Sequence, residues 1–149
     1  MALECVILVG LPGAGKTTFF RERFAATHRH ISKDLFPRAT ARQPRQDRLV
    51  REALAAGESV VVDNTNASPA ERAPSIRIAH EYGAAVVGYF VEASTREAVA
   101  RNRRREGRAR VPDVAVFACA KRLVPPTLAE GFDQIHHVRV QPDGGFAVS

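Results

Sequence analysis

Residues 10–17 carry the pattern with the clearest chemistry in the chain. They read Gly-Leu-Pro-Gly-Ala-Gly-Lys-Thr and fit G-x-x-x-x-G-K-[ST], between an apolar run and an expected helix. In such loops, glycines let successive backbone N–H groups surround phosphate oxygens, and the helix that follows adds partial positive charge. Lys16 can reach the β- and γ-phosphates and the Thr17 hydroxyl can ligate Mg²⁺, so the loop predicts ATP and Mg²⁺ as cofactors. The expected nucleotide-binding residues are Gly13, Ala14, Gly15, Lys16, Thr17 and Thr18.

A carboxylate that supports the metal is expected at Asp63, directly after the apolar residues 60–62. Where such a strand lies beside a phosphate-binding loop, its terminal Asp helps to hold Mg²⁺, often through water. The alternative is that Asp63 only caps the following turn, in which Asn64 and Asn66 are turn-forming residues.

A second carboxylate, Asp34, follows a weaker apolar segment within Ser32-Lys33-Asp34. Residues just beyond the carboxyl ends of parallel strands line the ligand crevice of open α/β sheets. In that place, Asp34 would face the γ-phosphate and could accept the proton of an attacking hydroxyl. Position alone leaves this role and that of a helix-capping Asp in a solvated loop equally open.

Residues 96–110 contain seven arginines, and Arg101 and Arg105 are spaced to share a helix face. Phosphoryl transfer spreads negative charge over oxygens that arginines on a lid can stabilise. The alternative is a solvated basic helix. We expect one or two of these arginines to act in catalysis and the others to lie at the surface.

The elements that would position these groups alternate along the chain. Nearly continuous apolar runs predict strands at 5–9, 59–62 and 84–91, with weaker candidates at 28–31 and 135–140 as the last strand. Helices are expected at 16–26, 45–56 and 113–123, and after Ser68 and Ser94, each of which has a Glu three residues later. This alternation predicts one α/β domain over residues 1–149, with a parallel sheet flanked by helices.

Composition limits the remaining classes. The 22 Lys and Arg against 16 Asp and Glu give a formal charge of +6, which attracts polyanions but does not identify one. No run is long enough to cross a membrane and none resembles a signal peptide, so we expect a cytoplasmic protein with no membrane partner. The distant Cys5 and Cys119 are expected to be buried thiols, and no His or Cys spacing predicts a structural metal site.

Six blocks of sequence together resemble the kinase domain of polynucleotide 5′-kinases, with similar blocks in small bacterial AAA-type ATP-binding kinases. They are GLPGAGKTTF, SKD, VVVDNTN, ARNRRREG, VPDVAVF and PPTLAEGFDQI, and the resemblance in order and spacing covers nearly the whole chain, roughly from Val6 to Val140. Many ATPases and GTPases share the first block, whereas the combination is more specific. The phosphatase motif D-x-D-G-T that accompanies many such kinases is missing from this sequence.

The resemblance implies an adenylate-kinase-like P-loop fold with an arginine-rich lid and transfer of the γ-phosphoryl group of ATP to a hydroxyl, typically a 5′-OH of DNA or RNA. It implies Lys16 and Thr17 in the donor and metal roles, Asp34 as general base and Asp63 as support for Mg²⁺. It also implies an arginine on the transferring phosphate, which is Arg105, or Arg104 or Arg101 if the lid aligns differently.

Two features of the resemblance concern other residues. Some relatives have an acceptor-binding Arg three residues after the base, where this chain has Pro37, so Arg38 is the candidate for acceptor binding. In the late block, Phe132 is expected in the core, with Glu130 and Gly131 shaping a turn.

Two other functions stay open. A small-metabolite kinase for a sugar or an antibiotic would share the loop, the base and the lid but would enclose its acceptor. This alternative stays open because few aromatic residues are free to stack on nucleic acid bases. A non-enzymatic ATP-binding module would need no base. The expected partners are therefore a nucleotide donor and either a nucleic acid 5′-OH end or a small hydroxylated substrate, with no obligate protein partner.

Overall fold

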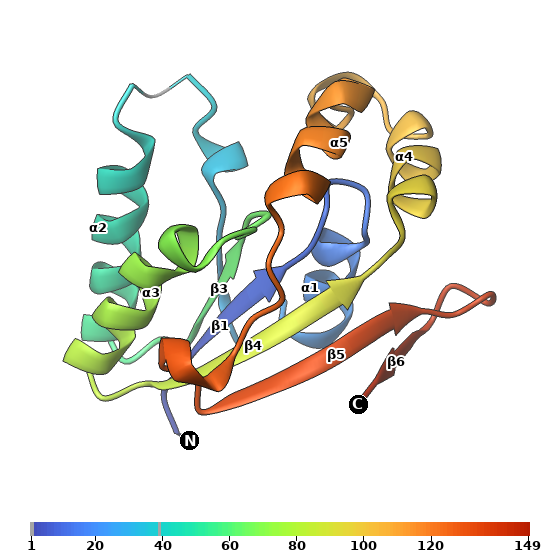
Figure 1. Cartoon of the computed structure of the whole chain (residues 1–149). Coiled ribbons are helices and arrows are strands. Elements are labelled where there is room, and N and C mark those ends of the chain that lie inside the picture. The colour runs from blue at the N-terminus through green and yellow to red at the C-terminus, as the bar shows by residue number, and fades with distance from the viewer. Residues whose placement is uncertain (1, 39) are drawn as a thin grey trace.

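Short apolar, β-branched segments build one six-stranded sheet in the computed structural model, which describes residues 2–38 and 40–149 (Figure 1). The strand order is β2-β3-β1-β4-β5-β6. The first five strands pair in parallel and β6 is antiparallel to β5. The strands are β1 (Glu4–Val9), β2 (Arg29–Ile31), β3 (Val60–Asp63), β4 (Ala85–Glu92), β5 (Gln134–Val140) and β6 (Phe146–Val148). The expected α/β fold is confirmed.

Five α-helices connect the strands in the described part of the chain. They are α1 (Lys16–Arg23), α2 (Arg42–Ala55), α3 (Pro69–Glu81), α4 (Thr95–Arg103) and α5 (Asp113–Arg122), with 3₁₀ turns η1 (Lys33–Leu35), η2 (Gly107–Ala109) and η3 (Leu128–Glu130). Ser94 and Glu97 form the expected reciprocal cap of α4. At α3 only half of that cap forms, because the Glu71 carboxylate accepts from the N–H of Ala67.

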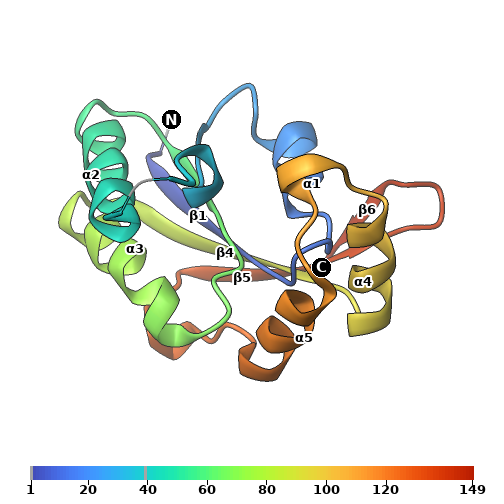
Figure 2. The same cartoon turned by 90° about the horizontal axis from the view of Figure 1, so that it is seen from above.

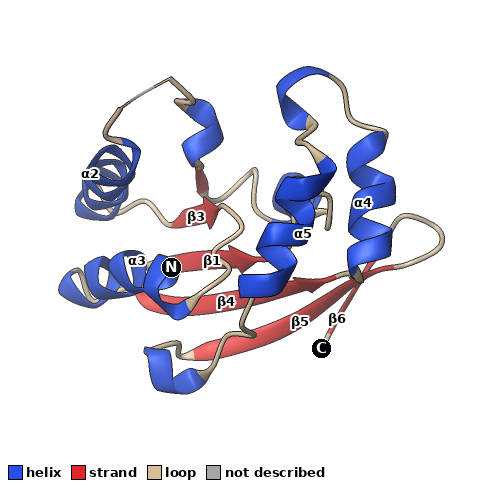
Figure 3. Ribbon diagram, turned by 45° about the horizontal axis from the view of Figure 1, so that its top comes forward, coloured by secondary structure: helices blue, strands red, loops and turns tan. Residues whose placement is uncertain are grey.

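Helices cover both faces of the sheet, as Figures 2 and 3 show. Successive side chains of β1 point to opposite faces, so Val6 and Leu8 pack with α1, α4 and α5, whereas Cys5 and Ile7 pack with α2 and α3. Burial on both faces explains why the strands are apolar without alternation. Cys119 is buried on α5, so both thiols are buried and free as expected.

Two helix boundaries differ from the expected ones by more than one residue, and the expected last strand is followed by another. The helix expected at 16–26 ends at Arg23, and α2 begins at Arg42 instead of residue 45. Pro44 does not prevent this earlier start, because N–H groups in the first helical turn need no partner within the helix. Residues 135–140 do form a strand within β5, but it is not the last one, because a hairpin leads to β6, where Phe146 packs against Phe19 with ring centroids 5.1 Å apart.

The carboxyl end of the sheet receives the loops that matter for function. The chain leaves β1 through α1 towards the edge strand β2, then returns through β3 and crosses over β1 to β4. Ligands of open α/β sheets bind at such a reversal of strand order, beyond the carboxyl ends of the strands. Among the described residues, no helix is long and apolar enough to cross a membrane.

Candidate active site

The glycine-rich loop joins β1 to α1 and packs closely on α4. Gly13 and Gly15 have φ of 85° and 107°, a region that side chains disfavour. A Cβ atom on Gly13 would lie 2.4 Å from the carbonyl oxygen of Ala98. Both the backbone conformation and the lack of space for a side chain therefore require glycine at residue 13. The loop leads directly into α1.

Lys16 begins α1 and its side chain is buried. Its Nζ donates to the carbonyl oxygens of Gly10 and Leu11 at 3.0 and 2.9 Å. An ammonium has three donors, so one N–H can still reach a phosphate oxygen. Burial lowers the pKa of Lys16, while the negative charge of Asp63 opposes this change.

Thr17 and Asp63 meet beside the loop. The Thr17 hydroxyl donates to Oδ2 of Asp63 at 2.9 Å, and Nε2 of His30 lies 2.8 Å from the same oxygen. Burial raises the pKa of Asp63, but the hydrogen bond to His30, the charge of Lys16 and the Thr17 hydroxyl outweigh it and bring that pKa below its usual value. The carboxylate is therefore ionised at neutral pH.

This donor pair fits Mg²⁺. Magnesium in nucleotide sites is held by one or two protein oxygens, several waters and the phosphates, not by a cluster of carboxylates. Thr17 and Asp63 supply a hydroxyl and a buried anionic oxygen. The described residues contain no group of three or more His, Cys, Asp or Glu that could hold a metal.

The turn after β3 bears on the alternative that Asp63 only caps this turn. Asn66 has φ of 45° and donates through Nδ2 to the carbonyl oxygen of Leu8 at 2.8 Å, so it is a turn-forming residue. Asp63 instead directs its carboxylate to Thr17 and His30. We call residues 63–66 the DNTN loop.

Asp34 lies in η1 with a side chain that is 93% exposed. Ser32 provides the cap of this turn, since its Oγ accepts from the N–H of Asp34 at 3.2 Å. The backbone N–H of Lys33 donates to Oδ1 of Asn64 at 2.9 Å, and Asn64 donates to buried Gln46 at 2.6 Å. The turn that carries Asp34 is thus attached to the DNTN loop.

A cleft of about 1200 Å³ opens at this end of the sheet. Seven of its lining residues are basic and three are acidic. Lys16, Thr17, Thr18, Asp34, Arg38, Asp63 and Arg105, all expected at the site, are brought together there. A cleft with this excess of positive charge attracts anionic ligands.

The three candidate lid arginines occupy different places. Arg105 lines the cleft and donates to the carbonyl oxygen of Ala109 at 3.1 Å. Arg101 lies 3.5 Å from the carbonyl oxygen of Ala14 in the phosphate loop. Arg104 is exposed just after α4 and is not among the residues that line the cleft.

Sequence reasoning missed the residue that holds the lid together. Asn102 is fully buried on α4, donates to the carbonyl oxygen of Val111 at 2.6 Å and accepts from the N–H of Val111 at 3.0 Å. These two hydrogen bonds between the side-chain amide of Asn102 and the backbone of Val111 fix the segment between α4 and α5. The residues around Asn102 in the ARNRRREG block gave no signal, because a buried Asn cannot be told from an exposed one without its partner.

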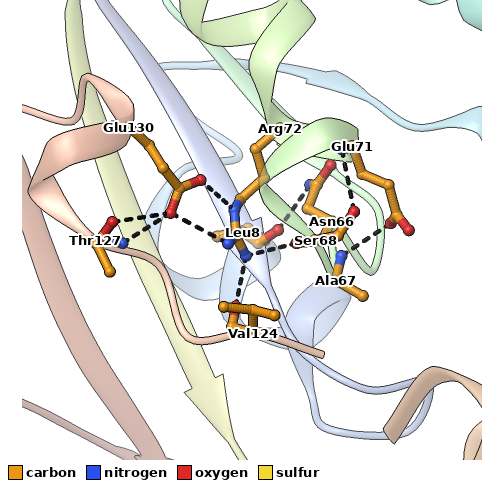
Figure 4. A network of polar contacts seen from close by, with 9 residues as sticks. All are labelled: Leu8, Asn66, Ala67, Ser68, Glu71, Arg72, Val124, Thr127 and Glu130. Atoms are coloured by element: carbon orange, nitrogen blue, oxygen red, sulfur yellow. Dashed lines mark hydrogen bonds and ion pairs between the residues drawn. The ribbon is translucent and has the colours of Figure 1, made fainter. Parts of the chain in front are cut away.

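Arg72 and Glu130 form a second group that the sequence did not predict (Figure 4). Arg72 is fully buried on α3, with Nε and Nη2 at 2.8 and 3.2 Å from the two carboxylate oxygens of Glu130. Glu130 does shape a turn with Thr127, as expected, but it also neutralises this buried cation. Phe132 is buried in the core, also as expected.

Comparison with known proteins is consistent with this geometry. A family model described as AAA domain matches residues 5–126. The bifunctional polynucleotide phosphatase/kinase of Schizosaccharomyces pombe (strain 972 / ATCC 24843) is 27% identical in an alignment of 141 residues that covers 91% of this chain and 33% of that protein. The chain therefore spans about a third of the length of this relative.

Two solved structures have a similar fold. A gluconokinase from Sinorhizobium meliloti 1021 has a TM-score of 0.65 and 21% identity, with 93% of this chain and 84% of that one covered. A fungal RNA kinase has a TM-score of 0.69 and 18% identity, with 93% and 38% covered.

Proposed function

This chain belongs to the AAA domain family and has the fold of P-loop kinases, and from its cleft we propose that it transfers the γ-phosphoryl group of ATP to the 5′-OH end of DNA or RNA. The observation that supports this most is the meeting, in one basic cleft, of the phosphate loop, Asp63 and the exposed carboxylate of Asp34. A nucleotide-binding switch would need no such hydroxyl-activating group, which argues against a non-enzymatic module.

The donor half of the reaction uses residues of the loop and the sheet. Backbone N–H groups of the loop and Lys16 would bind the phosphates, while Thr17 and Asp63 would hold Mg²⁺. The metal, when bound, neutralises part of the phosphate charge. Arg105, with Arg101 beside the loop, would stabilise the charge that develops on the transferred group.

The acceptor half depends on Asp34. The 5′-hydroxyl oxygen would attack the γ-phosphorus in line, the bond from that phosphorus to the β–γ bridging oxygen would break, and ADP would leave. Asp34 would accept the hydroxyl proton as the new oxygen–phosphorus bond forms. Arg38 and Arg42 both line the cleft, and Nη2 of Arg42 lies 4.0 Å from Oδ1 of Asp34, so these arginines are suited to the phosphates of an acceptor strand.

A small-metabolite kinase is the second candidate. Two observations support it. The structural similarity to a gluconokinase covers 84% of that chain, and none of the described residues that line the cleft is an aromatic residue that could stack on a base. The first candidate is favoured because the cleft is large and has more basic than acidic residues, which suits a polyanionic strand better than a neutral sugar. A cytoplasmic location stays a prediction that fits ATP and two free thiols.

The experiment is transfer of ³²P from [γ-³²P]ATP, with Mg²⁺, to DNA and RNA oligonucleotides with 5′-OH ends. K16A serves as the control without donor binding, and oligonucleotides with 5′-phosphate ends as the control without an acceptor. Label at the 5′ end that K16A abolishes supports the proposal. No label on either oligonucleotide, with ATP binding retained, contradicts it, and a panel of sugars and other small alcohols then tests the second candidate.

A further inference from the structure

The buried Arg72–Glu130 pair joins three segments that are distant in the sequence (Figure 4). Arg72 stands on the first turn of α3 and is 58 residues from Glu130 in η3. Its Nη1 donates to the carbonyl oxygens of Asn66 and Val124, both at 2.9 Å. One side chain thus contacts the end of the DNTN loop, the segment after α5 and the turn before β5.

The first of these contacts leads to the phosphate loop. Asn66, whose carbonyl oxygen Arg72 binds, donates its side-chain amide to the carbonyl oxygen of Leu8 on β1. Next to it, the carbonyl oxygen of Thr65 accepts from the N–H of Gly10, the first residue of the phosphate loop, at 3.1 Å. The position of the DNTN loop therefore affects both Asp63 and the loop that binds the donor.

The second contact leads to the lid, residues 95–122. Val124 follows α5, and its N–H donates to the carbonyl oxygen of Ala67 at 2.7 Å. The neighbour of Arg72, Glu71, accepts from Nε of Arg122, the last residue of α5, at 2.9 Å. Three separate hydrogen bonds thus attach residues 122–124, at the end of α5 and just after it, to residues 67–72, at the start of α3 and just before it.

Stability alone does not account for an arginine in this place. Buried ion pairs are costly to desolvate, and replacing both partners by apolar side chains is often neutral or stabilising. Apolar side chains cannot form directed hydrogen bonds. The planar guanidinium of Arg72 forms two hydrogen bonds with the carboxylate of Glu130 and still donates from Nη1 to two carbonyl oxygens.

We propose that Arg72, held by Glu130, is a positioning residue that fixes the end of the lid relative to the DNTN loop, so that the lid arginines reach the phosphates whose Mg²⁺ Asp63 would help to hold. The role rests on the proposed phosphoryl transfer. It also gives Glu130, in the PPTLAEGFDQI block, a role in positioning the site in addition to shaping its turn.

The test variant is R72M/E130M, which removes both charges at similar volume. Its matched control is R51M/E81M, which removes an ion pair of 3.2 Å at the exposed contact of α2 and α3, away from the cleft. All proteins are assayed as full chains at a temperature where circular dichroism shows them folded. We expect kcat of R72M/E130M to fall by roughly tenfold to a hundredfold, because misplacement of reacting groups by about 1 Å has effects of that size. The KM for ATP and all values of the control should stay near those of wild type.

A kcat of R72M/E130M within about twofold of wild type would overturn the proposal, because the pair would then be structural only. If the double variant does not fold, E130Q decides, since its amide oxygen still accepts from Arg72 but one anionic partner is lost. A lower kcat with unchanged KM for ATP supports the positioning role in E130Q, and an unchanged kcat overturns it.

Amide hydrogen exchange separates this inference from the proposed function. If wild type phosphorylates no acceptor, the proposed function fails, and exchange at Gly10 and Val124 decides the role of Arg72. Faster exchange at both amides in R72M/E130M or E130Q, with unchanged exchange at Ala85, whose N–H donates to Leu3 at 2.9 Å across the sheet, supports the coupling. Unchanged exchange at all three amides overturns it.

Discussion

The Thr17 hydroxyl donates to Oδ2 of Asp63 over 2.9 Å, and this bond joins the first turn of α1 to the end of β3 across 46 residues of sequence. His30 approaches the same oxygen from β2 at 2.8 Å. The buried carboxylate of Asp63, at the end of β3, is therefore contacted by residues from β2 and from α1, the helix that follows β1, and β2 and β1 are the two neighbours of β3 in the sheet. Because the pKa of Asp63 is lowered, its carboxylate is ionised at neutral pH.

The first prediction concerns this carboxylate and Mg²⁺. D63N keeps the size of the side chain but removes its charge, so the Mg²⁺ concentration for half-maximal activity should rise by about 10- to 100-fold, with partial recovery at high Mg²⁺. A magnesium titration of phosphoryl transfer measures this. D143N, in the β5–β6 hairpin, is the control. Equal magnesium dependence of D63N and wild type would remove Asp63 from the metal site.

The second prediction concerns Asp34. Because its carboxylate is exposed in the cleft and its turn is capped by Ser32, D34A should fold normally and bind ATP as wild type does. Loss of a general base lowers kcat by about 10²- to 10⁴-fold. Single-turnover transfer and equilibrium binding of a fluorescent ATP analogue measure the two quantities, with D47A on α2 as the control. Unchanged turnover in D34A would show that another group is the base.

The third prediction orders the lid arginines. Arg105 lines the cleft, whereas Arg104 is exposed outside it. R105A should therefore lower kcat by about 10²-fold or more, and R104A should change it by less than about threefold. The pair is well matched because both variants remove one positive charge from neighbouring positions. A larger loss in R104A than in R105A would mean that the lid adopts another arrangement during the reaction.

The features that sequence could predict are local in the chain. The phosphate loop is a run of eight residues whose glycine positions follow from backbone conformation, and β1 is recognisable because it is buried on both faces. Asp63 could be placed because it ends such a strand. The resemblance to polynucleotide kinases then related Asp34 to these residues, which position alone left open.

The features that sequence could not predict depend on distant partners. A buried arginine such as Arg72 looks like any surface arginine until Glu130, 58 residues away, is placed beside it. His30 gave no signal because its contact with Asp63 exists only once β2 pairs with β3. The strand β6 is three residues long, too short for a periodic pattern, and forms because Phe146 reaches the core.

The fourth prediction concerns the packing of Phe132 on β4. A Cβ atom on Gly88 would lie 2.9 Å from Cε1 of this buried ring, so G88A should lower the free energy of unfolding by about 1–3 kcal/mol. F132L makes room at the same place, so the double variant G88A/F132L should lose less than the sum of the single losses. Urea unfolding of the four proteins measures the coupling. Additive losses would show that the two residues are not in contact in solution.

The fifth prediction concerns the buried thiols. Burial in the sheet raises the pKa of Cys5 to about 12, and burial also raises the pKa of Cys119. Since the thiolate is the reactive form, native protein at pH 8 should react slowly with 5,5′-dithiobis(2-nitrobenzoic acid), while urea-unfolded protein should react rapidly at both thiols. Fast reaction of two thiols in the native state would contradict the buried placement.

The same raised pKa predicts how stability depends on pH. An unfolded thiol loses its proton near pH 8.5, whereas folded Cys5 keeps it up to about pH 12, so its contribution is complete below pH 8.5 and is lost as the pH rises between these values. Over that interval, wild type should lose about 1.4 kcal/mol per pH unit more than C5A, whose buried methyl group does not titrate. Urea unfolding at pH 8, 9.5 and 10.5 gives this difference, which removes the titration of all groups common to both proteins. Parallel pH profiles would mean that Cys5 ionises equally in the folded and unfolded chains, and hence that water reaches this end of β1.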